Sequence, residues 1–122
     1  MLTKTYKTGS NRGNARVWLE GAVLLQHGIL RGMPFKRDMN EKGFVLVFDD
    51  DERDDLVGDH HVAGTEQRPI IDLCGKWLTE CFDGAPNYTA EFVAARDNQP
   101  PAITIVSRRS MIDAYLQLSK RK

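Results

Sequence analysis

A dense group of acids and histidines in the middle of the chain is the first place where chemistry is conceivable. Asp59, His60 and His61 follow a run of aspartates. Carboxylates bind hard cations and imidazoles suit transition metals, so these residue types could serve a metal-dependent phosphoesterase. Such sites draw ligands from several distant motifs, and His27 is the only other histidine. We therefore favour a solvated linker over a metal site, and we expect no metal and no other cofactor.

Two further segments could support nucleophilic catalysis or phosphate binding. A catalytic Cys74 or Cys81 would need a neighbouring histidine and a lowered pKa, and we expect both to be reduced packing thiols instead. Residues 9–13 read Gly-Ser-Asn-Arg-Gly, a loop that lacks the spacing and the Lys-Ser/Thr ending of a P-loop. A hairpin turn is the favoured interpretation there, and it is compatible with a phosphate contact. Nothing assembles an acid, a base and a nucleophile, so we expect no catalytic residues and no enzymatic activity.

The charge of the chain is balanced overall but unevenly distributed. Residues 1–48 carry eight basic side chains against three acids, residues 49–67 carry eight acids against one arginine, and residues 107–122 carry five basic side chains against one acid. This asymmetry favours a polyanionic partner, with the acidic connector limiting non-specific binding. No run approaches the roughly 20 apolar residues of a membrane helix, and the first residues lack an export signal. We expect a cytoplasmic protein without a membrane partner.

An internal repeat is the strongest signal of the fold. Residues 16–31 and 70–84 align at an offset of about 54 positions, and each copy is followed by a Gly-x-Pro turn and two strand-like runs. The aligned apolar and glycine positions are Val17 with Ile71, Leu19 with Leu73, Gly21 with Gly75, and Leu24 with Leu78. A unit of this size cannot bury a core of its own, so we expect the two halves to complete one core together.

Hydrophobic periodicity predicts the elements of each half. In the first half we expect strands over residues 4–8 and 16–19, a helix over 20–27, and a hairpin of 35–39 with 44–48. In the second half we expect a strand over 69–73, a helix over 75–82, and a hairpin of 87–94 with 102–107. Trp18 and Trp77 lie beside repeated core positions, so we expect packing roles for both rather than base stacking.

The last segment predicts a helix without a counterpart in the first half. Ser110 is its expected N-cap, with Asp113 three residues later. The expected apolar face consists of Met111, Ile112, Tyr115, Leu116 and Leu118. This helix should lie across the outside of the core or dock a second chain.

The run from Tyr6 to Gly21, with Arg-Val-Trp-Leu-Glu-Gly at its end and Leu24 and Gly28 beyond it, resembles the small AbrB/SymE-like domains. The chain is also similar to the non-catalytic N-terminal extension of some phage- and plasmid-type DNA cytosine methyltransferases, through residues 6–21 and through Arg-Pro-Ile-Ile-Asp-Leu at 68–73. The resemblance implies an α+β, mostly β fold: a pseudo-two-fold, swapped-hairpin-like barrel made of two tandem repeats, plus the C-terminal helix. The parts would be residues 1–48, an acidic connector over 49–67, residues 68–106, and the basic helix over 107–122.

Two functions remain open at this stage, both non-enzymatic. The resemblance implies a small nucleic-acid-binding protein, a phage or mobile-element transcription regulator with DNA as its expected partner. Basic residues on the first strand and the adjacent loops would make the contacts, namely Lys7, Arg12, Arg16, Arg31, Lys36 and Arg37. The alternative is an anti-defence inhibitor of a host defence protein, acting through the connector or the C-terminal helix with Asp50, Asp51, Asp54, Met111 and Tyr115. Either protein could be a monomer or a homodimer.

Overall fold

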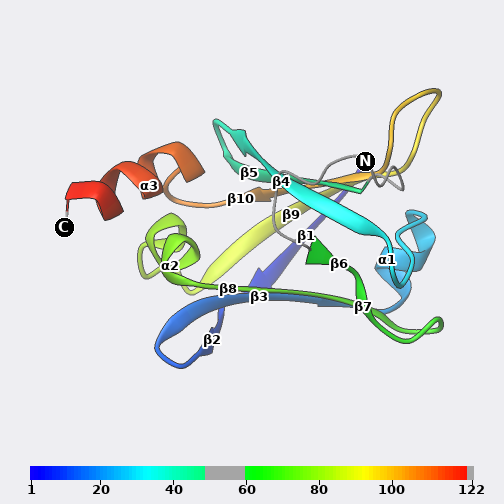
Figure 1. Ribbon diagram of the computed structural model, residues 1–122, viewed down its shortest axis with the longest axis horizontal. Helices are drawn as coiled ribbons and strands as arrows, with labels where there is room; N and C mark the ends of the chain where they lie inside the picture. Colours follow the sequence, from blue (N-terminus) through cyan, green and yellow to red (C-terminus); the bar gives the residue numbers. More distant parts are fainter. Residues whose placement is uncertain (49–59, 121–122) are drawn as a thin grey trace.

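The computed structural model describes residues 1–48 and 60–120, which form a mostly β structure of the α+β class with a C-terminal helix (Figure 1). The elements of the first half are β1 Leu2–Lys7, β2 Gly9–Asn11, β3 Asn14–Glu20, α1 Ala22–Gln26, β4 Pro34–Asn40 and β5 Gly43–Phe48. The second half, taken together with two short strands at the end of the expected connector, consists of β6 His60–His61, β7 Ala63–Gly64, β8 Pro69–Cys74, α2 Lys76–Phe82, β9 Asn87–Val93 and β10 Ala102–Val106. It is followed by α3 Met111–Lys120.

The strands form two antiparallel sheets whose order reflects the sequence repeat. The larger sheet has the order β1-β9-β10-β5-β4-β6 and the smaller one β2-β3-β8-β7. Strands β1 to β5 of the first half correspond in order to β6 to β10 of the second half. If each strand is exchanged for its counterpart, both strand orders are reversed and otherwise unchanged. The first strand of each half therefore pairs with the hairpin of the other half, β1 with β9 and β6 with β4. The two sheets are not closed into a barrel, so the barrel itself is not confirmed.

The core lies between the sheets and draws on both halves. Alternation along β3 and β8 buries Val17 and Leu19 opposite Leu73 and Ile71. The central β5–β10 pair contributes Phe44, Leu46, Ile103 and Ile105 to the same cluster. Burying a side chain of this size stabilises the fold by about 1.5–3 kcal/mol. Separating the halves would expose most of these residues, which explains why the small repeat exists as a pair.

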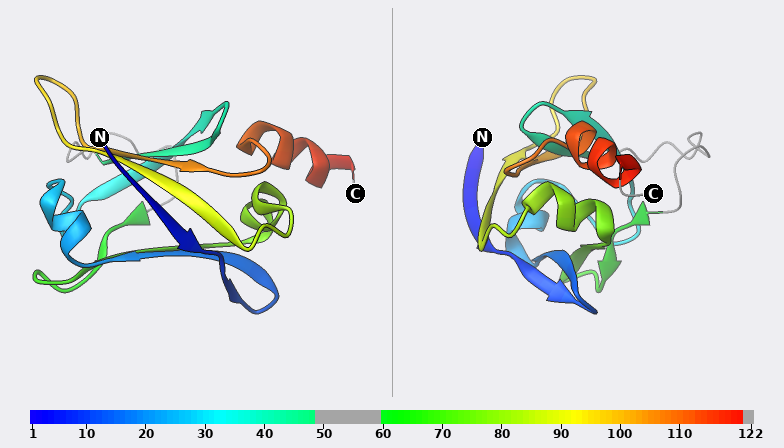
Figure 2. Two further views of the ribbon diagram at one scale, coloured as in Figure 1. Left: turned by 180° about the vertical axis from the view of Figure 1, so that it is seen from behind. Right: turned by 90° about the vertical axis from the view of Figure 1, so that its left-hand side faces the viewer.

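The helices gather at the two ends of the molecule (Figure 2). The second helix, α2, and the third, α3, lie with the β2–β3 turn at one end, called here the α2/α3 end, while α1 lies at the opposite end. Among the described residues, no helix has the length and apolar character needed to cross a membrane.

The start of α3 agrees with the capping expectation. The Ser110 Oγ accepts a hydrogen bond from the Asp113 amide at 3.2 Å. Met111 and Ala114 are buried, and α3 packs against α2. A partly buried ion pair ties the segment just before α3 to α2, because Arg109 Nη1 lies 2.7 Å from Glu80 Oε2 on α2. The helix thus lies across the outside of the core at the α2/α3 end.

Two local expectations were wrong in detail. Residues 9–11 form the strand β2 rather than part of a longer turn, since they pair with residues 14–16 of β3. Trp18 is 40% exposed instead of packed in the core. Because Val17 and Leu19 both point inward, strand alternation forces the side chain between them outward. Trp77 does pack inside, with its ring edge-on to Phe44 at a centroid distance of 5.0 Å.

Candidate nucleic-acid interface

A shallow cleft lies on the outer face of the six-stranded sheet at the α2/α3 end. Its volume is about 350 Å³, and it is formed where β1 ends, β9 begins and β10 ends. The residues that line it are Thr5, Ala85, Pro86, Asn87, Tyr88, Thr89, Val106, Ser107 and Arg108. Strand pairing brings the polar side chains of Thr5, Asn87 and Thr89 together. Thr5 on β1 lies opposite Thr89 on β9, and Asn87 lies opposite Lys7, two residues after Thr5. The open surface of the cleft therefore offers hydroxyl and amide groups.

Two cations flank this cleft. Lys7 is exposed and lies opposite Asn87, on the same face of β1 as Thr5. Arg108 lines the cleft from the segment after β10, and its Nη1 donates to the Asp83 carbonyl oxygen at 3.3 Å. Within the described part of the chain, Lys7 forms no ion pair. Its full positive charge is therefore available to an anion at this cleft.

An aromatic stack supports the cleft from below. Tyr88 stacks on Phe82 and on Tyr6, with centroid distances of 5.0 and 5.7 Å. Burial raises the pKa of Tyr88 and of Tyr6, so both hydroxyls stay neutral. This rigid, uncharged aromatic stack holds the polar side chains above it in place without repelling an anion.

Arg12 lies at the tip of the neighbouring β2–β3 hairpin. Arg12 and Gly13 have φ values of 53° and 83°, as expected for a two-residue hairpin turn with left-handed central residues. The hairpin is anchored to α2, because Thr79 Oγ1 accepts from the Ala15 amide at 2.9 Å and lies 3.1 Å from Asn14 Oδ1. The hairpin turn is therefore limited to Arg12 and Gly13, and it presents Arg12 to solvent at the α2/α3 end.

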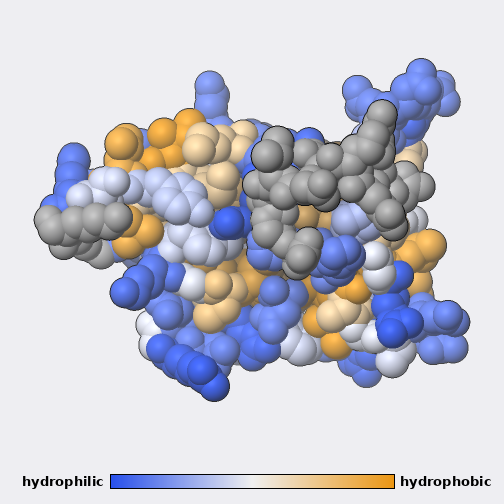
Figure 3. Space-filling view, viewed as in Figure 1, coloured by the Kyte–Doolittle hydropathy of each residue, from blue (hydrophilic) through white to orange (hydrophobic). Residues whose placement is uncertain are grey.

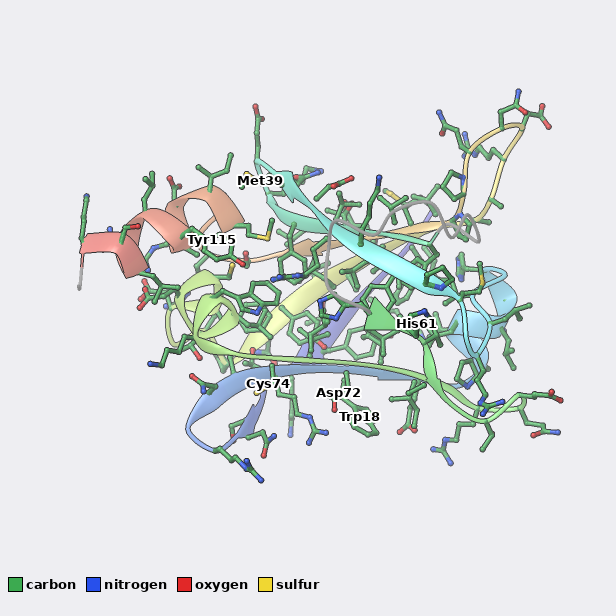
Figure 4. The ribbon with its side chains drawn as sticks, in the orientation of Figure 1. Trp18, Met39, His61, Asp72, Cys74 and Tyr115 are labelled. Atoms are coloured by element: carbon green, nitrogen blue, oxygen red, sulfur yellow. The ribbon has the colours of Figure 1, made fainter. Side chains whose placement is uncertain are left out.

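Arg16 is engaged by an acid on the next strand. Its Nε and Nη2 donate to the two carboxylate oxygens of Asp72, each at 2.8 Å. Its guanidinium also lies over the Trp18 ring, 4.5 Å from the centroid. The hydrogen bond to Asp72 raises the pKa of Arg16. Figure 4 shows Trp18 and Asp72 pointing away from the body of the protein, so this is a neutralised surface pair and not an open cation.

The other three predicted basic residues lie elsewhere. Arg37 points inward from β4, with its guanidinium 4.1 Å from the centre of the Trp77 ring, and its Nε is buried without a hydrogen-bond partner. Lys36 is half-buried on the opposite face of β4. Arg31 is exposed beyond α1, at the opposite end of the molecule from the cleft. The structure thus places Lys7 and Arg12 at the same end of the molecule, but not the whole predicted set.

Arg108 is the residue that sequence reasoning missed at this site. It was counted only as part of a basic tail. Its place beside Lys7 depends on the β1–β9–β10 pairing, which joins segments about 100 residues apart. The basic character of residues 107–122 was the one signal available in the sequence.

The residues of the alternative function are only partly visible. Asp50, Asp51 and Asp54 lie outside the described residues. Met111 is 4% exposed and belongs to the core, so it cannot contact a protein target, whereas Tyr115 is 38% exposed.

The remaining chemical candidates do not form a site in the described residues. Asp59 lies outside them, and the His60 ring stacks on Phe35 at 5.4 Å. No three His, Cys, Asp or Glu side chains of residues 1–48 and 60–120 group closely enough to hold a metal ion. Cys74 is exposed, whereas Cys81 is buried and burial raises its pKa to about 11, which opposes the nucleophilic thiolate.

Comparison with known proteins returned no match: no family model, no curated protein and no solved structure matched this chain.

Proposed function

We propose that this protein binds nucleic acid through phosphate contacts made at the α2/α3 end by Lys7, Arg108 and Arg12. The observation that carries the proposal is the pair of cations flanking a cleft lined by Thr5, Asn87 and Thr89. Phosphate oxygens take hydrogen bonds from lysine, arginine, threonine and asparagine side chains, which are the groups present here. The cleft is shallow and open, so it suits a strand of backbone crossing the surface rather than an enclosed small molecule.

The contacts described here position a nucleic acid without reading its sequence. In the described part of the chain the cleft is lined by strand ends and loops and not by a helix, and its groups suit phosphate better than base edges. We therefore expect binding that depends strongly on salt, because each neutralised phosphate releases condensed counterions. DNA is the expected partner, in a regulatory role of the AbrB/SymE-like kind.

The strand order supports the likeness to AbrB/SymE-like domains at the level of topology. Each half gives its first strand to the hairpin of the other half, as a swapped-hairpin architecture within one chain would require. The barrel description belongs to the same proposal. Fold likeness does not carry the function by itself, and the cleft is what makes the proposal testable.

The test is fluorescence anisotropy with a labelled duplex of arbitrary sequence at low salt. Lys7→Ala and Arg108→Ala should each raise the dissociation constant about three- to tenfold, because each removes one charged phosphate contact. Arg31→Ala is the matched control, since it removes an equally exposed cation at the opposite end. If all three substitutions weaken duplex binding equally, the effect is one of net charge and the proposed site is refuted. If the natural protein does not bind the duplex, the proposed function is refuted.

A further inference from the structure

The helix α3 is apolar on two opposite sides. Its inner side buries Met111 and Ala114, while Ile112 and Leu116, one turn apart on the outer side, are 45% and 55% exposed. In Figure 1 and in the left view of Figure 2, α3 extends beyond the two sheets, with its outer side uncovered by any other described element. Figure 3 shows hydrophobic residues gathered over this part of the molecule. Packing within the monomer accounts for the inner side only.

The neighbouring strand β4 enlarges the outer apolar surface. Met39 is 59% exposed and Tyr115 is 38% exposed, and the elements that carry them, β4 and α3, are in contact (Figure 4). Arg37 Nη1 donates to the Tyr115 hydroxyl at 3.3 Å, which ties α3 to β4. We call the surface made by Met39, Ile112, Tyr115 and Leu116 the α3 face. Leucine, isoleucine, methionine and tyrosine side chains exposed side by side are typical of an interface between proteins.

The charges that flank Leu116 indicate what covers this face. Asp113 and Lys120 lie three residues before and four residues after Leu116, so both are on its side of the helix at opposite ends, and both are exposed. If two copies of α3 pack antiparallel with Leu116 at the centre, Asp113 of each copy lies beside Lys120 of the other. A parallel pair would instead set like charges side by side. A second copy of the chain therefore complements the face in both apolarity and charge.

We propose that the protein forms a two-fold symmetric homodimer through antiparallel packing of the α3 faces. One helix and one methionine from each chain form a small contact, so the dimer should be weak and concentration-dependent. Its dissociation constant should be in the range of about 1–100 µM.

The dimer has a consequence that rests on the proposed function. The pseudo-two-fold relates the Lys7–Asn87 pair to the His61–Pro34 pair. Because the second pair lacks the lysine and the asparagine, the described part of each monomer has one cationic cleft. Because α3 lies at the same end as the cleft, dimerisation would bring two clefts to neighbouring positions. One nucleic acid could then contact both. Dimerisation itself needs no nucleic acid, so it can be tested separately.

The first test is sedimentation equilibrium of the protein without nucleic acid, from about 1 to 200 µM. The natural protein should show a monomer–dimer equilibrium, and Leu116→Asp should weaken dimerisation at least about tenfold. Leu30→Asp is the matched control, because Leu30 is 51% exposed but lies beyond α1 at the opposite end. A protein that stays monomeric throughout would overturn the proposal and leave the face to a different protein. Equal weakening by both substitutions would also overturn it.

Disulfide trapping tests the antiparallel geometry. In a Cys74→Ser background, Asp113→Cys mixed with Lys120→Cys should form more cross-linked dimer than either variant alone. Preferential cross-linking within each single variant would indicate a parallel pair and refute the proposed packing.

Discussion

Replacement of Arg109 by alanine should show how the C-terminal helix is held to the core. The Arg109 guanidinium lies 2.7 Å from Glu80 Oε2 and 3.6 Å from Asp83 Oδ2, and its Nη1 also donates to the Glu80 carbonyl oxygen at 3.2 Å. The Glu80 side chain is only 6% exposed. Arg109→Ala would therefore remove the arginine charge that faces this buried carboxylate.

The expected loss follows from these contacts. Breaking a buried ion pair by removing one partner costs about 3–5 kcal/mol. Since a quarter of the Arg109 side chain is exposed, solvent weakens the pair, and we expect about 2–3 kcal/mol. With an unfolding entropy of about 2.1 cal/mol/K per residue, 122 residues give about 0.26 kcal/mol/K, so the melting temperature should fall by about 8–12 °C.

Calorimetry or thermal circular dichroism would measure this fall against a matched arginine. Arg68 pairs with Glu20 at 3.0 Å, but its side chain is 68% exposed, so Arg68→Ala should cost no more than about 0.5 kcal/mol. Adding Glu80→Gln to Arg109→Ala should recover part of the stability, because it removes the buried carboxylate charge that Arg109 faces in the natural protein. The reasoning fails if Arg109→Ala is as mild as Arg68→Ala, or if Glu80→Gln brings no recovery.

Two further predictions concern thiol reactivity and the surface ion pair. At pH 8, Ellman's reagent should modify the exposed Cys74 of the folded protein, while Cys81, buried and with its pKa raised to about 11, should react only on unfolding; rapid reaction of both would contradict the packing around α2. Arg16→Ala should weaken nucleic-acid binding less than about twofold in the anisotropy assay, because Asp72 already neutralises Arg16; a loss equal to that of Lys7→Ala would contradict this.

Local sequence patterns predicted most of the strands and helices. The apolar run from Phe44 to Phe48 predicts a strand, and the Ser110 cap predicts the start of α3. The extent of β1 and of the two hairpins agrees to within about two residues, because these runs alternate strongly and end at turn residues. The short strands β6 and β7 have too few residues to produce a period, so their pairing with β4 and β8 could be found only in three dimensions.

The candidate site was harder to predict because it depends on contacts between distant segments. The sequence indicates that Arg16 and Asp72 are polar strand residues, but only the β3–β8 register shows that they neutralise each other. Arg108 and Lys7 lie near one another only because β1 and β10 both pair with β9. The error at Trp18 had a different origin, since its place beside repeated core positions suggested packing while the alternation of Val17 and Leu19 required exposure.

Mapping the nucleic-acid contact by NMR tests the central proposal most directly. The measurement is a ¹H–¹⁵N correlation spectrum of the labelled protein titrated with a short DNA duplex at low salt. We expect the largest chemical-shift changes at Thr5, Lys7, Asn87, Thr89 and Arg108, with smaller changes at Arg12 and none at Arg31. Changes confined to the α1 end, or a spectrum unaffected by saturating duplex, would contradict the proposed interface.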